Sequence, residues 1–443
     1  MSSRFIEDLP SCSTTPRALP DEVFYYMARD IIDEKSDIAS LSRTCRPLFQ
    51  LLEHLLYRAD VLETRETEID GQSGEACLCG VQYGGDDFDT QLGLQNSRVP
   101  VPHIPALHWA VTQSDKSLGL AVAGKCITAA LIHWPNYLHV SCQKLKNMTP
   151  LQLAAKDGLE EIVKELVEAS SFVDARVCFN SLNHPGEFPL IQQYCLYRLI
   201  RQPARFYIPL NALGIAIMFG HTRIAETLAQ HTRELEETSG RGAKDLMPPL
   251  KLAAFTNMPS VVRILQDRGY QSKDGNAHFT GASALHLAAI VDGSDETLEL
   301  LLNNGADINT VDTHGGDAFQ RALERYRTAG DCISNLVVLA RHYSLEEGPQ
   351  HFFKHARTFL RHGDLLPVVK VLLQDRSATY DPSDYSRLHS VAFEYLDHRR
   401  NDLNPEMLDY LVHHPSLKFS EGSHSMEFEE LQLEIEKSLN RSS

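Results

Sequence analysis

The stretch that decides the fold is Ser283–Ala289, which reads SALHLAA, followed by the run LELLLNNGADIN that ends at Asn309. The first piece predicts the start of a short helix. Its leucine faces a core, and its pair of alanines lets a neighbouring helix approach closely. The second piece predicts a leucine-rich helix that ends at a glycine, which can adopt the left-handed conformation found after helices. The stretch therefore predicts a pair of short antiparallel helices that needs neighbours to bury its apolar side.

A second copy of the unit begins at Thr149–Ala155, which reads TPLQLAA. Thr149 is a candidate N-cap, because its hydroxyl can accept a backbone N–H at the helix start. Pro150 suits the first helical position, where its missing N–H is not needed. Gly158 is placed to end this helix, and the apolar residues of Ile162–Leu166 predict the second helix of the pair.

An apolar marker at the third position of each unit shows how far the pattern extends. From the third marker onward the spacing is 34 to 37 residues, whereas the two earlier steps are longer. Insertions near 114–125 and 174–209 account for the longer steps. The markers are Leu107, Leu151, Leu213, Leu250, Leu285, Phe319, Phe353 and Leu388.

This pattern resembles that of ankyrin repeats, whose period is about 33 residues. The resemblance implies an all-α fold with short β-turn loops, in which an ankyrin-type solenoid of about eight units spans residues 103–415. His108 and His286 match a histidine that supports the turn in this family. Residues 416–443 are predicted to form a capping helix, with a free tail as the alternative. A generic helical solenoid or bundle with accidental alanine pairs is the alternative to the repeat itself.

A smaller module precedes the array at residues 19–61, after an N-terminal segment, 1–18, that we expect to be disordered. The periodicity of its apolar residues predicts three short amphipathic helices. A module of this size is near the lower limit for an independent core, so it needs a partner or a neighbouring domain. Residues 62–102 are rich in glycine and acids, lack periodicity and predict a flexible linker.

The module resembles an F-box in its LPxE[VIL] opening and its D[IL]xxLSx[TV]C[RK] middle segment, although Pro47 departs from the family pattern. The resemblance implies binding to the Skp-type adaptor of a Skp–cullin–F-box ubiquitin ligase, with the repeats capturing a target protein. By matching position, the adaptor-binding residues are Leu19, Pro20, Val23, Ile38 and Leu41. The alternative is an ankyrin-repeat scaffold without a ligase role, in which this module only caps the array.

Composition and motifs argue against other classes of function. The net charge of −17 makes nucleic acid an unsuitable partner, and no apolar run is long enough to cross a membrane. Nine scattered cysteines and the lack of a signal peptide predict a cytoplasmic or nuclear protein with free thiols. Cys77 and Cys79 lack the spacing of a zinc site. We therefore expect a non-enzyme with no catalytic, metal-binding or cofactor-binding residues.

Overall fold

The computed structural model describes ten segments of the chain. It divides into two compact units, residues 1–273 with 277–279 and residues 280–443 with 274–276. The described segments are 46–71, 103–169, 173–175, 177–180, 207–233, 248–270, 282–312, 314–344, 347–373 and 404–412.

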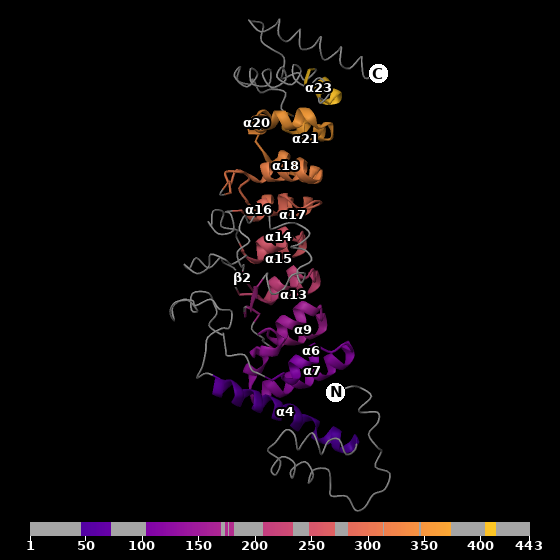
Figure 1. Ribbon diagram of the computed structural model, residues 1–443, viewed down its shortest axis with the longest axis vertical. Helices are drawn as coiled ribbons and strands as arrows, with labels where there is room; N and C mark the ends of the chain where they lie inside the picture. The colour runs from indigo at the N-terminus through magenta and orange to yellow at the C-terminus, as the bar shows by residue number, and fades with distance from the viewer. Residues whose placement is uncertain are drawn as a thin grey trace, which may run out of the picture. The chain divides into compact units, whose positions relative to one another are not determined.

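The first described element of the first unit is helix α4, Arg46–Gly71, which runs for 26 residues without a break (Figure 1). Pro47 lies in its first turn, where a proline is tolerated. The prediction that the N-terminal module ends at 61 and a linker begins at 62 is wrong, because the helix continues through residues 62–71. Val61 and Thr64 are buried, so packing holds the second half of the helix in place.

Four helix pairs follow α4 in the first unit. The first helices of the pairs pack on one another in the order α6, α8, α12, α14, and the second helices pack in the order α7, α9, α13, α15 (Figure 1). Two parallel rows of helices define a solenoid. The pairs are α6 Ala106–Val111 with α7 Lys116–His133, α8 Pro150–Asp157 with α9 Glu160–Glu168, α12 Ala212–Met218 with α13 Thr222–His231, and α14 Pro249–Phe255 with α15 Pro259–Asp267.

The insertion predicted at 114–125 lies mostly within a helix. Helix α7 has 18 residues, against 9 in α9 and 10 in α13, and residues 116–125 form its first half. The extra residues of the first unit therefore lengthen a helix. Two 3-10 turns, η1 Pro135–His139 and η2 Gln143–Leu145, lead from α7 to the next pair.

The insertion predicted at 174–209 begins and ends in a two-stranded antiparallel ladder. Strand β1, Val177–Asn180, pairs with β2, Tyr207–Leu210, with Val177 opposite Leu210. The intervening residues 181–206 lie outside the described residues. Because α8 packs directly on α12 and α9 on α13, the inserted segment does not separate the units on either side of it.

The second unit repeats the same arrangement. Helix α16 packs on α18, and α17, α19 and α21 follow one another. Helix α20 is longer than the other first helices, and it starts six residues before the marker Phe353. The elements are α16 Ala284–Ala289, α17 Asp295–Asn303, α18 Ala318–Ala329, α19 Ile333–His342, α20 Glu347–Arg361, η4 Gly363–Leu365, α21 Leu366–Leu372 and α23 Pro405–Val412.

The predicted markers form the cores of the two units. Each marker from Leu107 to Phe319 is at most 1% exposed, and the alanine pair that follows Leu285 is fully buried. The expected all-α solenoid is confirmed. The third predicted helix of the N-terminal module lies within α4. The marker Leu388, the first two predicted helices of that module and the tail 416–443 lie outside the described residues, so those expectations stay predictions.

Candidate protein-interaction surface

The helix starts are fixed by local caps. Thr149 accepts a hydrogen bond from the backbone N–H of Gln152, and the Gln152 side chain accepts one from the backbone N–H of Thr149 at 2.8 Å. These reciprocal bonds satisfy donors that a helix start leaves unpaired. Gly158 has a φ of 72°, which ends the helix in the left-handed conformation. Both predicted roles are confirmed.

In three of the helix-start motifs, the side chain of the fourth residue ties one unit to the loop that follows. His108 donates from Nε2 to the Met148 carbonyl at 3.2 Å, and His286 donates to the Gly316 carbonyl at 3.0 Å. Gln152 makes the equivalent bond to Ala175 at 2.8 Å. Gln152 and His286 also bond within their own turns, and all three side chains set the distance between a helix start and the loop that follows it.

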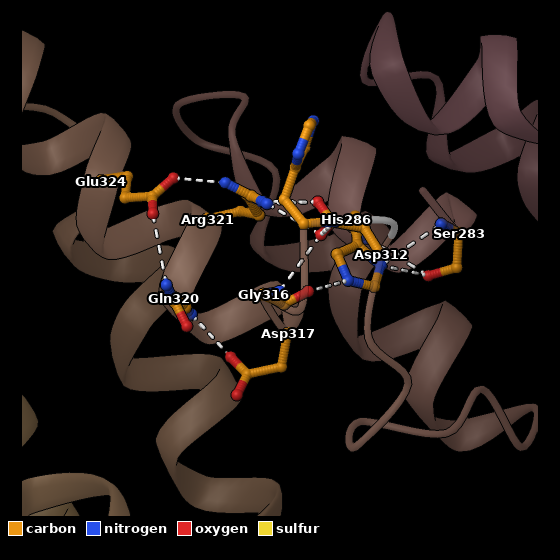
Figure 2. A network of polar contacts seen from close by, with 9 residues as sticks. Ser283, His286, Asp312, Gly316, Asp317, Gln320, Arg321 and Glu324 are labelled. Carbon is orange, nitrogen blue, oxygen red and sulfur yellow. Dashed lines mark hydrogen bonds and ion pairs between the residues drawn. The ribbon is translucent and has the colours of Figure 1, made fainter. Parts of the chain in front are cut away.

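Figure 2 shows how this contact is extended in the second unit. The Ser283 N–H donates to Nδ1 of His286, which leaves the proton on Nε2 for the Gly316 carbonyl. Asp312 accepts the Gly316 N–H and a two-point bond from Arg321, at 2.6 and 2.8 Å. The loop before α18 is thereby held to α16 on one side and to α18 on the other (Figure 2).

Burial keeps both histidines neutral. The buried surroundings lower the pKa of His108 to about 4, and burial also lowers the pKa of His286. A neutral ring can accept at Nδ1 and donate at Nε2, as the Figure 2 network requires of His286. Their chemistry is that of fixed hydrogen-bond donors in the framework.

The junction between α4 and the first pair is built from polar groups. The Tyr137 hydroxyl donates to the Asp60 carboxylate and accepts from the Leu107 N–H at 3.2 Å. Asp60 also accepts the Ala106 N–H at 2.9 Å, and Asp60 and Tyr137 are both 1% exposed. Burial and the Asp60 charge raise the pKa of Tyr137 well above its ordinary value. A buried network of this kind fixes α4 to the start of the α6 helix.

A second contact joins α4 to the residue at which the described chain resumes. Thr64 of α4 is 3.2 Å from Nε2 of His103, the first described residue after that segment. Sequence reasoning did not find these junction residues, because a buried Asp or Thr interrupts the apolar periodicity on which helix prediction relies.

The predicted adaptor-binding residues Leu19, Pro20, Val23, Ile38 and Leu41 lie outside the described residues. Within the described segments, no three His, Cys, Asp or Glu side chains are arranged to hold a metal ion. Cys126, Cys142 and Cys332 are buried and form no disulfide. No helix in the described part of the chain is long and apolar enough to cross a membrane.

Comparison with known proteins supports the repeat assignment. Residues 213–312 match a family model of ankyrin repeats (3 copies), and residues 146–177 match the single ankyrin repeat. The chain is 26% identical over 231 residues to E3 ubiquitin-protein ligase KEG of Arabidopsis thaliana. That similarity covers 52% of this chain and only 13% of the plant protein. Ankyrin repeats are non-catalytic modules that bind proteins, so the solenoid of this chain provides a protein-interaction surface.

Proposed function

We propose that the chain is a non-catalytic substrate receptor of a Skp–cullin–F-box ubiquitin ligase. In this proposal residues 19–45 bind the Skp-type adaptor, the adaptor binds a cullin, and the ankyrin array holds the target protein. The receptor forms and breaks no bond, but raises the effective concentration of the target near the ligase. The F-box resemblance and the similarity to a plant E3 ubiquitin-protein ligase support this role.

The junction at α4 is the observation that carries the proposal. Helix α4 contains the last predicted segment of the F-box-like module. The same helix packs on α7 and is joined to the start of α6 through Asp60, and its Leu55 and Val61 are buried. A helix of 26 residues is about 39 Å long, so it can join two binding modules without a flexible connection. The adaptor and the target would then be held in a defined geometry, which favours transfer to particular lysines.

Substitution of the predicted adaptor contacts tests the proposal. Leu19→Ala combined with Pro20→Ala removes two side chains that the resemblance places in the adaptor groove. Truncation of a central interface anchor typically costs a few kcal/mol, so co-purification of the adaptor should be lost. Val311→Ala, at a side chain that is 56% exposed on the second unit, is the control. Equal recovery of the adaptor with the double variant would contradict the proposal.

The second candidate is an ankyrin scaffold whose N-terminal helices only cap the array. The burial of Leu55 and Val61 favours a capping role for α4 itself, whatever residues 19–45 do. Removal of residues 2–61 would therefore destabilise the array under either hypothesis. Removal of residues 2–45 leaves α4 in place and discriminates. A receptor should lose the adaptor and keep its melting temperature, whereas a scaffold with a larger cap should melt earlier.

A further inference from the structure

The junction between α18 and α20 has an unusual core, because two histidines of α20 pack on a phenylalanine of α18. The rings of His351 and His355, one helical turn apart, have centroids 5.8 and 6.2 Å from that of Phe319. His351 also stacks on Tyr343, the C-cap of α19, with ring centroids 3.9 Å apart. Phe319 is fully buried and Tyr343 is 7% exposed. Two rings that can gain a proton thus occupy a place where apolar side chains are usual.

Three polar atoms of this core have no hydrogen-bond partner among the described residues. They are Nδ1 of His351, Nε2 of His355 and the Tyr343 hydroxyl, and all three atoms are buried. The large majority of buried side-chain polar atoms in proteins are paired, so three exceptions around one phenylalanine are unusual. A charge on a buried ring without a partner would cost still more than the neutral ring does. The packing on Phe319 therefore depends on both histidines being neutral.

Only His351 has a carboxylate close by within the described part of the junction. The Asp317 carboxylate lies 3.9 Å from Nδ1 of His351. The same carboxylate lies 3.7 Å from the ammonium of Lys354 and accepts the Gln320 N–H that caps α18. Burial lowers the pKa of His351, although the charges of Asp317 and Glu347 act in the opposite direction. The nearest carboxylate is thus already shared, and it does not offset the burial of this ring.

His355 is less suited to a positive charge than His351. Burial, and then the positive charge of Lys354, lower its pKa to about 4. A proton on His351 acts in the same direction, whereas the carboxylates of Asp317 and Glu324 oppose it more weakly than burial does. Protonation of either histidine therefore makes protonation of the other more costly while both rings remain packed.

The charged groups described on the other elements that pack on α20 are occupied elsewhere or exposed. Asp364 of η4 accepts a hydrogen bond from the Tyr326 hydroxyl. Lys370 of α21 lies over the Tyr410 ring, and Glu406 of α23 is exposed. The balance of charge at the two histidines is therefore set by α18 and by α20 itself.

From this arrangement we propose that the α18–α20 junction is an acid-sensitive latch, in which protonation of His351 and His355 releases α20 from Phe319. An opened α20 takes up protons at a higher pH than the packed helix does, so a fall in pH favours the opened form. Helix α23 packs on α20 and should be released with it, whereas α21 is also held by α19. The latch would thus change the length of the ordered array, independently of any ligase role.

Hydrogen exchange of the full chain at pH 7 and pH 5, corrected for the intrinsic pH dependence of exchange, tests the latch. A shift of the His355 pKa from 6.5 to about 4 predicts roughly 20-fold lower protection of α20 amides at pH 5 from this residue alone. A variant with His351→Phe and His355→Leu keeps the core filled and removes both titrating rings. Its α20 amides should lose less than about threefold. His314→Gln, at an exposed histidine of the same unit, should retain the wild-type loss.

His355→Gln is a milder change that keeps the test decisive if the double substitution disturbs folding. Its loss of α20 protection at pH 5 should be smaller than that of the wild type, because only His351 remains to titrate. Equal protection of α20 in the wild type at the two pH values would overturn the proposal. A wild-type loss that both variants retain in full would assign the acid sensitivity to the carboxylates of the junction and contradict the inference.

Discussion

Replacement of Tyr137 by phenylalanine should open the N-terminal end of the array and leave the second unit intact. The change removes the hydroxyl that donates to Asp60 and accepts from the Leu107 N–H. A hydrogen bond to a charged group contributes about 1.5–3 kcal/mol, and a buried N–H without a partner costs about 1–3 kcal/mol. Because the two effects overlap, we expect a loss of about 2–4 kcal/mol.

In a repeat protein such a loss acts locally, because each unit contacts only its neighbours. Hydrogen exchange of the full chain should show protection of α4 and α6 amides reduced by roughly 30- to 900-fold, the equivalent of that energy. The amides of α16–α19 should be unchanged. Thr67→Ala is the control within α4, since the Thr67 hydroxyl bonds only to carbonyls of its own helix. Wild-type protection of α6 in the Tyr137→Phe variant, or an equal loss in both units, would refute the reasoning.

Three further predictions concern the first unit. The pKa of His108 is about 4 in the folded chain, below the usual value, so the unfolded chain takes up the proton first as the pH falls. About 3 kcal/mol of stability is therefore present above pH ~6.5 and is lost between pH ~6.5 and 4. Denaturation across this range should show a weaker pH dependence for His108→Gln, because glutamine already makes the same contact at position 152. Gly119→Ala should lower the free energy of unfolding, measured by urea titration, by about 1–3 kcal/mol, since the new Cβ would lie 2.6 Å from the Ala110 carbonyl oxygen. Gly124→Ala, the control in the same helix, should leave that free energy unchanged or raise it by up to about 1 kcal/mol. Replacement of residues 181–206 by Asn-Gly should leave the melting temperature unchanged or raise it. The β1–β2 ladder and the helix contacts on either side remain, and closing a shorter connection between the two strands costs less conformational entropy.

The repeat was predictable because its signals are local. Thr149, Pro150 and Gly158 define one helix within ten residues of sequence, and the marker leucines recur at nearly the period of the unit. Each of these residues acts through its own backbone or through the adjacent unit. A single sequence therefore contains the information needed to place them.

The junction with α4 was not predictable in the same way. Asp60 reads as a solvent-facing acid, and its partner Tyr137 lies 77 residues later. The apolar pattern of the helix weakens at the point where its buried face becomes polar, so the sequence indicated a linker where the helix continues. Only the folded arrangement shows that the Asp60 carboxylate occupies a buried position where an apolar side chain would be usual.

Marker spacing also cannot distinguish a longer helix from an inserted loop. The first unit has extra residues, and Gly119 and Gly124 reduce helix propensity within them. In the structure Gly119 lies against the Ala110 carbonyl, where a larger residue would not fit between α6 and α7. This glycine, which lowers the intrinsic helix propensity, is required by the close packing of α7 on α6. Similarly, the four-residue strands β1 and β2 are separated by 26 residues, which is too far for a hairpin signal in the sequence, and they are defined only by their pairing.

Calorimetry of the full chain with a purified Skp-type adaptor tests the central claim most directly, when it is repeated with a chain that lacks residues 2–45. The proposed function predicts a one-to-one complex with a dissociation constant below about 1 µM, and no heat of binding from the truncated chain at an unchanged melting temperature. Absence of binding by the full chain, or equal binding by both chains, would contradict a receptor role for the N-terminal module.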